Sequence, residues 1–174
     1  TRDRRVAGAM PPLFRRPEAP PGLTLAPGER LLARAESEMG PIAATTHHLM
    51  LPADGGFHAI GWENVERATW NRDDDQLVVV ETAPLGAKPR RHRIGLGEAT
   101  SFLDVVREQV QASVVISRHV PITDERGVRV SGRRRPGQRR LAWVVAVDAG
   151  IDLDEPAVRA RVDEAVAQVR AEVE

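Results

Sequence analysis

Apolar and polar residues alternate along the first half of the chain, as they do in half-buried β-strands. In LAPGERLLARAESE, Leu31, Ala33 and Ala35 alternate with polar neighbours after a turn signal at Pro27–Gly28. Further runs with strand character follow at residues 40–53, 56–62, 65–70, 77–83 and 91–97. The pattern predicts about five or six short strands over roughly 70 residues, joined by hairpins as an antiparallel meander.

The period of the apolar residues changes after residue 98. In EATSFLDVVREQVQASVV they recur at helical spacing, with Phe102 and Val106 on one face. A β-hairpin follows, from HVPITDERGVRVSG to RRLAWVVAV, and then a helix in EPAVRARVDEAVAQVRAEVE. The stripe of Val158 and Val162 on this last helix is expected to face the core, with an interface as the alternative. The order strands, helix, hairpin, helix predicts an α+β fold, an antiparallel meander with segregated helices.

Three stretches resemble small actinobacterial proteins with a pleckstrin-homology-like (PH-like) domain, namely LAPGERLLARAE, IGWENVERATWNRDDDQLVV and FLDVVREQVQASVV. The motif of Trp62 and Trp70 followed by an acidic turn resembles bacterial PH and GRAM-like sequences. The resemblance implies a PH-like barrel or sandwich at residues 25–116, capped by the amphipathic helix. Residues 117–174 would be a hairpin-and-helix extension packed on the same domain. PH-like folds carry many unrelated binding roles. The loop AESEMGPIA lacks the basic residues of phosphoinositide-binding PH domains, which argues against that ligand.

The charge and composition of the chain limit the classes of function that it can have. The net charge is zero, so attraction of an anion must come from local clusters. Lys88 is the single lysine among 25 basic residues, and cysteine is absent, which excludes disulfides and thiolate chemistry. No apolar run approaches the roughly 20 residues of a membrane-spanning helix. Six of the 13 prolines lie by Pro27, so residues 1–24 are predicted to be a disordered basic arm, or simply an untied terminus. The expected location is cytoplasmic.

Histidines are the first candidates for a chemical site. A tight hairpin at Asp54–Gly55 would put His47 and His58 on one face but four residues apart along it, roughly 13 Å, too far for one ion. His92 and His119 have no carboxylate or histidine at ligand spacing. We therefore expect no metal and no cofactor.

Catalytic motifs are also missing from the sequence. No serine lies in a G-x-S-x-G elbow, and there is no phosphate-binding glycine loop. The acidic segment Asp73–Asp75 is expected to be a hydrated turn that blunts a sheet edge, with a weak divalent-cation site as the alternative. We expect no catalytic residue, no small-molecule substrate and no enzymatic activity.

Two basic clusters remain. Seven arginines and no acid lie between Arg126 and Arg140, with Pro136–Gly137 forming a turn, and a second cluster is KPRRHR at residues 88–93. If the clusters lie side by side they form a surface for an anionic partner, because arginine binds phosphate and carboxylate groups bidentately. Solvated turns are the alternative. The candidate contacts are Arg90, Arg91, Arg93, Arg129, Arg133, Arg134, Arg135, Arg139 and Arg140.

These patterns favour a non-enzymatic binding or adaptor module in a cytoplasmic protein assembly, with the arginine turn contacting a protein partner. The alternative is backbone-type binding of RNA or DNA through the same arginines and the arm. Aromatic residues are scarce, with three Trp, three Phe and no Tyr, so no platform for base stacking is visible.

Overall fold

The computed structural model describes residues 17–173, in which the strands form three antiparallel sheets. The first sheet contains β1 (Leu31–Ser37), β2 (Gly40–Thr45), β3 (His48–Ala53) and β4 (Gly56–Gly61). A 3-10 turn, η2 (Trp62–Asn64), leads into the second sheet of β5 (Val65–Asn71), β6 (Gln76–Glu81) and β7 (Arg91–Gly95). The third sheet contains β8 (Val114–Thr123), β9 (Arg126–Arg133) and β10 (Ala142–Val147), with β9 in the middle. The helices are α1 (Thr100–Ser113) and α2 (Pro156–Ala171), so the predicted α+β class is confirmed.

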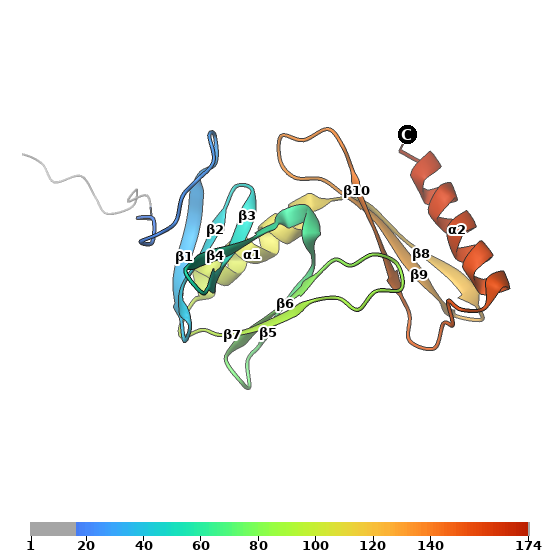
Figure 1. Cartoon of the computed structure of the whole chain (residues 1–174), viewed down its shortest axis with the longest axis horizontal. Helices are drawn as coiled ribbons and strands as arrows, with labels where there is room; N and C mark the ends of the chain where they lie inside the picture. The colour runs from blue at the N-terminus through green and yellow to red at the C-terminus, as the bar shows by residue number, and fades with distance from the viewer. Residues whose placement is uncertain (1–16, 174) are drawn as a thin grey trace, which may run out of the picture.

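The first two sheets and α1 share one hydrophobic core. Trp62, Leu77, Phe102 and Val106 are buried together in it, and the helical face predicted for α1 is the buried face. The two sheets are not closed into a barrel. Among residues 17–173 there is one isolated β-bridge, between Ser37 and Leu96. It pairs the end of β1, in the first sheet, with the residue that follows β7, in the second. Figure 1 shows α1 packed beside these sheets.

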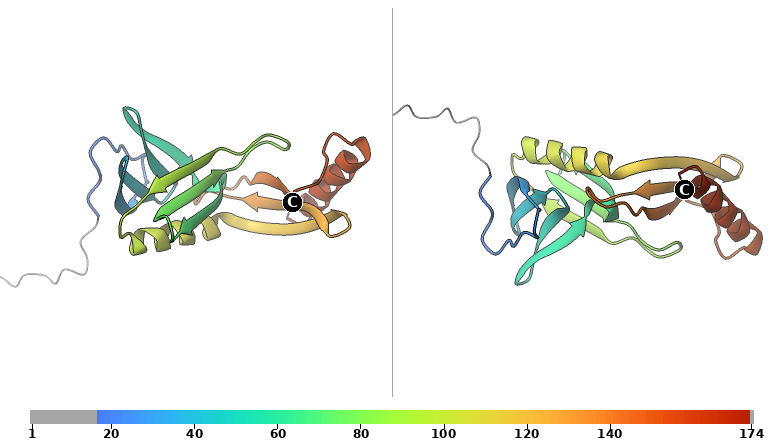
Figure 2. Two further views of the ribbon diagram at one scale, coloured as in Figure 1. Left: turned by 90° about the horizontal axis from the view of Figure 1, so that it is seen from below. Right: turned by 90° about the horizontal axis from the view of Figure 1, so that it is seen from above.

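The third sheet and α2 form a second core at the other end of the long axis of the molecule (Figure 1). Val158 and Val162 of α2 pack with Val128 and Val130 of β9, so the apolar stripe of the last helix is core, as expected. In Figure 2, α1 continues directly into β8, which connects the two halves. The extension therefore has a hydrophobic cluster of its own, and its first strand begins at Val114, three residues before the predicted boundary.

The described residues before α1 form seven strands where five or six were predicted, because the run at residues 40–53 is folded back on itself as β2 and β3. Thr45 makes this turn without glycine or proline: its Oγ1 accepts hydrogen bonds from the backbone N–H groups of His47 and His48, at 3.2 and 2.8 Å. Hydroxyl-capped turns of this kind carry a weak sequence signal. The Asp54–Gly55 hairpin is confirmed, and Gly55 alone of the pair has positive φ.

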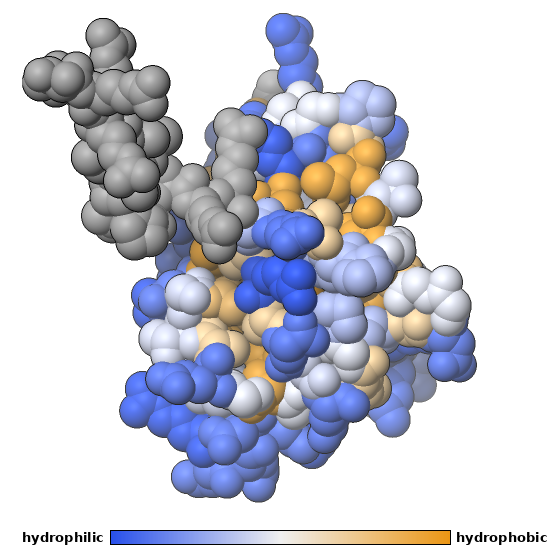
Figure 3. Space-filling model, turned by 90° about the vertical axis from the view of Figure 1, so that its left-hand side faces the viewer, coloured by the Kyte–Doolittle hydropathy of each residue, from blue (hydrophilic) through white to orange (hydrophobic). Residues whose placement is uncertain are grey.

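The predicted arm lies mostly outside the described residues, which begin at Pro17. Residues 17–24 contain a turn and no strand or helix. Neither described helix is long and apolar enough to cross a membrane. The end of the molecule turned towards the viewer in Figure 3 shows small hydrophobic areas interrupted by hydrophilic ones.

A buried carboxylate ties the segment before β1 to the first sheet. Glu29 is 7% exposed and accepts hydrogen bonds from the Thr45 hydroxyl, from His48 Nδ1 at 2.7 Å and from the backbone N–H of Ala26 at 3.0 Å. Burial acts to raise the pKa of Glu29, but the hydrogen bonds from Thr45, His48 and Ala26 together lower it below its ordinary value of 4.5. The ionised form of Glu29 therefore stabilises the native state.

Acidification should remove this contribution. Because the folded pKa of Glu29 is the lower one, its stabilisation is present above pH 4.5 and is lost as the pH falls through the folded pKa. Urea unfolding between about pH 6 and pH 3 should show the wild type losing more stability than Glu29→Gln. A matched Glu125→Gln change, at an exposed turn, should reproduce the wild-type pH dependence. Parallel curves for Glu29→Gln and wild type would contradict the expectation.

Candidate anion-binding pocket

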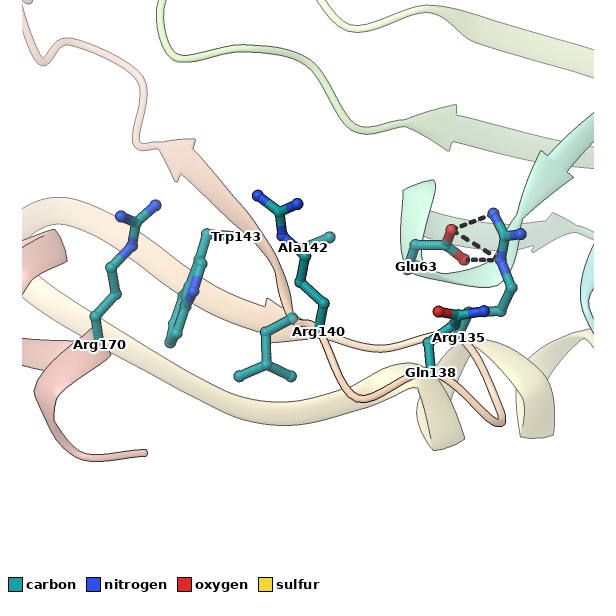
Figure 4. Close-up of a pocket in the computed structure, with 8 residues that line it drawn as sticks. Glu63, Arg135, Gln138, Arg140, Ala142, Trp143 and Arg170 are labelled. Atoms are coloured by element: carbon teal, nitrogen blue, oxygen red, sulfur yellow. Dashed lines mark hydrogen bonds and ion pairs between the residues drawn. The ribbon is translucent and has the colours of Figure 1, made fainter. Parts of the chain in front are cut away.

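The loop between β9 and β10, residues 134–141, borders an open pocket of about 580 Å³. The lining comes from η2, this loop, the start of β10 and the end of α2, which are distant in sequence. The residues are Glu63, Arg135, Gln138, Arg140, Leu141, Ala142, Trp143 and Arg170. Figure 4 shows their arrangement, with Trp143 between Arg170 and Arg140 and the Glu63–Arg135 pair beyond.

Glu63 and Arg135 neutralise each other at one end of the pocket. The Nε of Arg135 donates to both carboxylate oxygens of Glu63, at 3.0 and 3.1 Å, and Nη2 donates to one of them. The hydrogen bond with Glu63 raises the pKa of Arg135 above its ordinary value. A Cβ on Gly61 would come within 2.6 Å of a Glu63 oxygen and 2.8 Å of the Arg135 guanidinium, so glycine leaves room for the pair. The pair fixes the loop to η2.

The positive charge of the pocket comes from Arg140 and Arg170. The guanidinium carbon of Arg170 lies 5.4 Å from the ring centroid of Trp143, a cation–π geometry that orients the side chain. Both arginines are exposed, and neither forms an ion pair among residues 17–173. Since Arg135 and Glu63 cancel, the pocket carries an excess of two positive charges beside a half-buried indole.

Four of the predicted contacts belong to the turn itself. Arg134, Arg139 and Arg140 are exposed, and Arg135 is half-buried in its ion pair. Arg139 and Arg140 were expected to begin the return strand, but β10 begins at Ala142 and they stay in the loop. Three arginines of the predicted set are therefore exposed and without an ion pair among residues 17–173, but of these only Arg140 lines the pocket.

Arg133 is not on the surface, which corrects the prediction for that residue. It is the last residue of β9 and is 7% exposed. Its Nη1 donates to the carbonyl oxygen of Val65 at 2.7 Å and to Ser113 Oγ at 3.1 Å, and Nη2 donates to the carbonyl oxygen of Glu66 at 2.8 Å. Burial lowers the pKa of Arg133, opposed by the charge of Glu66. The side chain joins β9 to β5 and α1, so it cannot contact a partner.

The second basic cluster does not join the first. Arg90, Arg91 and Arg93 are exposed at the start of β7 and just before it, and the loop that leads into β7 lies against the far end of β10, where Pro89 and Leu153 line another pocket. The arginine turn precedes the opposite end of β10, about 16 Å away along that strand. Arg129 is exposed as predicted and pairs in register with Ala146, also towards the far end. The single surface expected from the two clusters is therefore not formed.

The residues that complete the pocket's charge and its aromatic wall escaped the sequence analysis, namely Glu63, Trp143 and Arg170. Glu63 is 72 residues from its partner Arg135, and Arg170 lies on the exposed side of a helix in a chain rich in arginine. Only the packing of α2 on the third sheet brings Arg170 to Trp143. No local pattern marks any of the three.

The expected separation of His47 and His58 is confirmed, but the expectation that His92 and His119 lack carboxylate partners is wrong. The register Leu51–His58 and the hydrogen bond from the Trp62 N–H to the His47 carbonyl agree with the expected separation of His47 and His58. His119 was expected to lack a carboxylate partner, and its Nε2 lies 2.8 Å from Asp148 Oδ2. His92 was also expected to lack one, and its Nε2 lies 2.5 Å from Glu81 Oε1. The pairing of β6 with β7 and the packing of the two sheets account for the His92 contact.

Comparison of the chain with protein-family models, with curated proteins and with solved structures finds no match.

Proposed function

We propose that this protein is a non-enzymatic, cytoplasmic binding module, whose pocket at the arginine turn holds an acidic segment of a protein partner. The observation that carries the proposal is the charge arrangement of the pocket: Arg140 and Arg170 are unpaired on either side of Trp143, while the one acid, Glu63, is neutralised by Arg135. Guanidinium groups bind carboxylates in a bidentate geometry, and the indole offers apolar contact beside them.

The disposition of Trp143 favours a peptide over a nucleic acid. Arg170 already lies over the indole ring, and a base that stacked on that face would have to displace it. The predicted second cluster of arginines is at the other end of β10, so the pocket lacks the long basic track that follows a phosphate backbone. A short acidic segment matches the local excess of two positive charges.

We further propose that residues 25–116 are a PH-like domain in an open form. The order of the elements supports this proposal, since a four-stranded sheet is followed by a three-stranded sheet and then by a helix. The sequence stretches that resemble the family support it as well. The open arrangement of the two sheets departs from a closed barrel. Residues 117–173 would then be an addition that supplies most of the pocket.

Charge reversal at the pocket should weaken binding of an acidic probe. The probe is a fluorescein-labelled glutamate-rich peptide, followed by fluorescence polarisation at about 50 mM and about 500 mM salt. Arg140→Glu/Arg170→Glu should weaken binding at least ~10-fold, because both unpaired charges of the pocket are inverted. A labelled single-stranded oligonucleotide is titrated in parallel.

The matched control is Arg161→Glu/Arg67→Glu, which reverses the same number of charges at two exposed arginines outside the pocket lining, one on α2 and one on β5. It should weaken peptide binding much less than Arg140→Glu/Arg170→Glu does. Equal losses in the two double variants would contradict a specific pocket. Binding of the oligonucleotide but not of the peptide would replace the proposal with nucleic-acid binding.

A further inference from the structure

Three side chains from both sheets of the first core meet away from the arginine pocket. His58 lies on β4, Glu81 ends β6 and His92 lies on β7. Glu81 Oε1 lies 2.9 Å from His58 Nε2 and 2.5 Å from His92 Nε2. The ligating atoms of the three residues are all within 4.8 Å of one another. One carboxylate and two imidazoles therefore converge on a single point.

The strand pattern explains why they converge. His58, Glu81 and His92 each lie two residues from a buried core residue on the same strand: Ile60, Val79 and Ile94. Alternate residues of a strand face the same side, so all three side chains continue the inward-facing rows of the two sheets. They cover the end of the hydrophobic core, and they are 19 to 35% exposed, which leaves the cluster open to solvent.

The carboxylate is ready to act as a ligand. One oxygen of Glu81, Oε1, lies against the Nε2 atoms of both histidines. The two imidazole rings are 5.5 Å apart between centroids, with 36° between their planes. Their Nε2 atoms both face the same oxygen, which leaves both Nδ1 atoms directed elsewhere.

We infer that His58, Glu81 and His92 form a binding site for a first-row divalent transition-metal ion, with Zn²⁺ the preferred occupant. Two imidazoles and one carboxylate are a donor set suited to Zn²⁺, whose ligands lie about 2.0–2.2 Å from the ion and so roughly 3.3–3.6 Å from one another. To meet that requirement, the two Glu81–histidine separations would open by up to about 1 Å, and the two histidine ligand atoms, now within 4.8 Å of each other, would come to the same range. Solvent access leaves the fourth position for water. The ion would link β4 of the first sheet to β6 and β7 of the second.

The test uses the full chain without a histidine tag, titrated with Zn²⁺ by isothermal calorimetry. One ion per chain is expected to bind, and thermal unfolding is expected to move to higher temperature when Zn²⁺ is added, because the ion binds the folded state. His58→Ala and His92→Ala should each weaken binding at least ~100-fold, since each removes a direct ligand. Co²⁺ in place of Zn²⁺ should give the visible absorption of a low-symmetry four-coordinate site in the wild type, a readout that needs no variant.

His119→Ala is the matched control. His119 also pairs with a carboxylate, Asp148, at 2.8 Å, but it lies on the third sheet and outside the cluster. It should bind Zn²⁺ as the wild type does. Failure of the wild type to bind Zn²⁺ and to show Co²⁺ absorption would overturn the inference, as would unchanged affinity in both His58→Ala and His92→Ala. This outcome is independent of peptide binding at the arginine pocket.

Discussion

Replacing Arg133 with alanine is expected to lower the free energy of unfolding by about 3 kcal/mol. The substitution removes three hydrogen bonds from one buried guanidinium, and hydrogen bonds to charged groups contribute about 1.5–3 kcal/mol each before the cost of burying the charge is subtracted. It also leaves the carbonyl oxygens of Val65 and Glu66 without this donor. Relief of the buried charge offsets part of the loss, since Nε of Arg133 has no partner among the described residues.

The position of Arg133 makes a second effect measurable. The side chain joins the third sheet, which has its own core with α2, to β5 of the first core. Its removal weakens the link between two hydrophobic clusters more than it weakens either cluster. Urea unfolding followed by tryptophan fluorescence should therefore show a lower midpoint and a broader transition, because Trp62 reports on one core and Trp143 on the other.

The control for this prediction is the next residue along the chain. Arg134 is exposed, and its side chain has no hydrogen bond within residues 17–173, so Arg134→Ala should change stability by no more than about 0.5 kcal/mol. The two variants remove the same charge one residue apart. Equal stability of Arg133→Ala and Arg134→Ala would show that the buried contacts do not hold the two parts together.

Gly127→Ala is expected to destabilise the third sheet by about 3 kcal/mol or more. A Cβ at Gly127 would lie 2.0 Å from the carbonyl oxygen of Val120 and 2.8 Å from the Cα of Pro121. Both are backbone atoms of the paired strand β8, so no side-chain rotation can relieve the overlap. The backbone N–H of Gly127 also donates to Asp148 Oδ2 at 2.7 Å, and a shift of the strand would break this bond.

Gly97→Ala tests whether the loss comes from the overlap and not from alanine itself. Gly97 has negative φ and no atom within 4 Å of an added Cβ. The substitution should leave the free energy of unfolding within about 0.5 kcal/mol of the wild-type value, or raise it slightly by restricting the unfolded chain. Circular dichroism during urea unfolding measures both variants. A Gly127→Ala protein as stable as Gly97→Ala would contradict the close approach of β8 and β9.

The sequence predicted elements wherever one local signal was enough. Alternation identified the strand around Leu31, a continuous β-branched run identified the one at Leu77, the Asp54–Gly55 pair marked a hairpin, and helical spacing marked the buried face of α1. It missed the turn at Thr45, since a hydroxyl cap has no strong signature. It also ran the helix past Ser113 into Val114, where a β-branched run begins β8.

The sequence did not predict the roles of individual polar residues. Arg133, Arg134 and Arg135 are consecutive and chemically identical in the sequence, yet one is buried against backbone carbonyls, one is exposed and one pairs with Glu63. His92 was expected to be isolated because its partners lie 11 and 34 residues away along the chain.

The sequence by itself therefore determined the fold class and most of the elements, because periodicity is a property of neighbouring residues. The tertiary structure alone decided which arginines are free to bind, which two strands bring His58 and His92 to Glu81, and which helix brings Arg170 to Trp143. These are contacts between residues distant in sequence. They depend on how the sheets pack against one another, and local pattern contains no information about that packing.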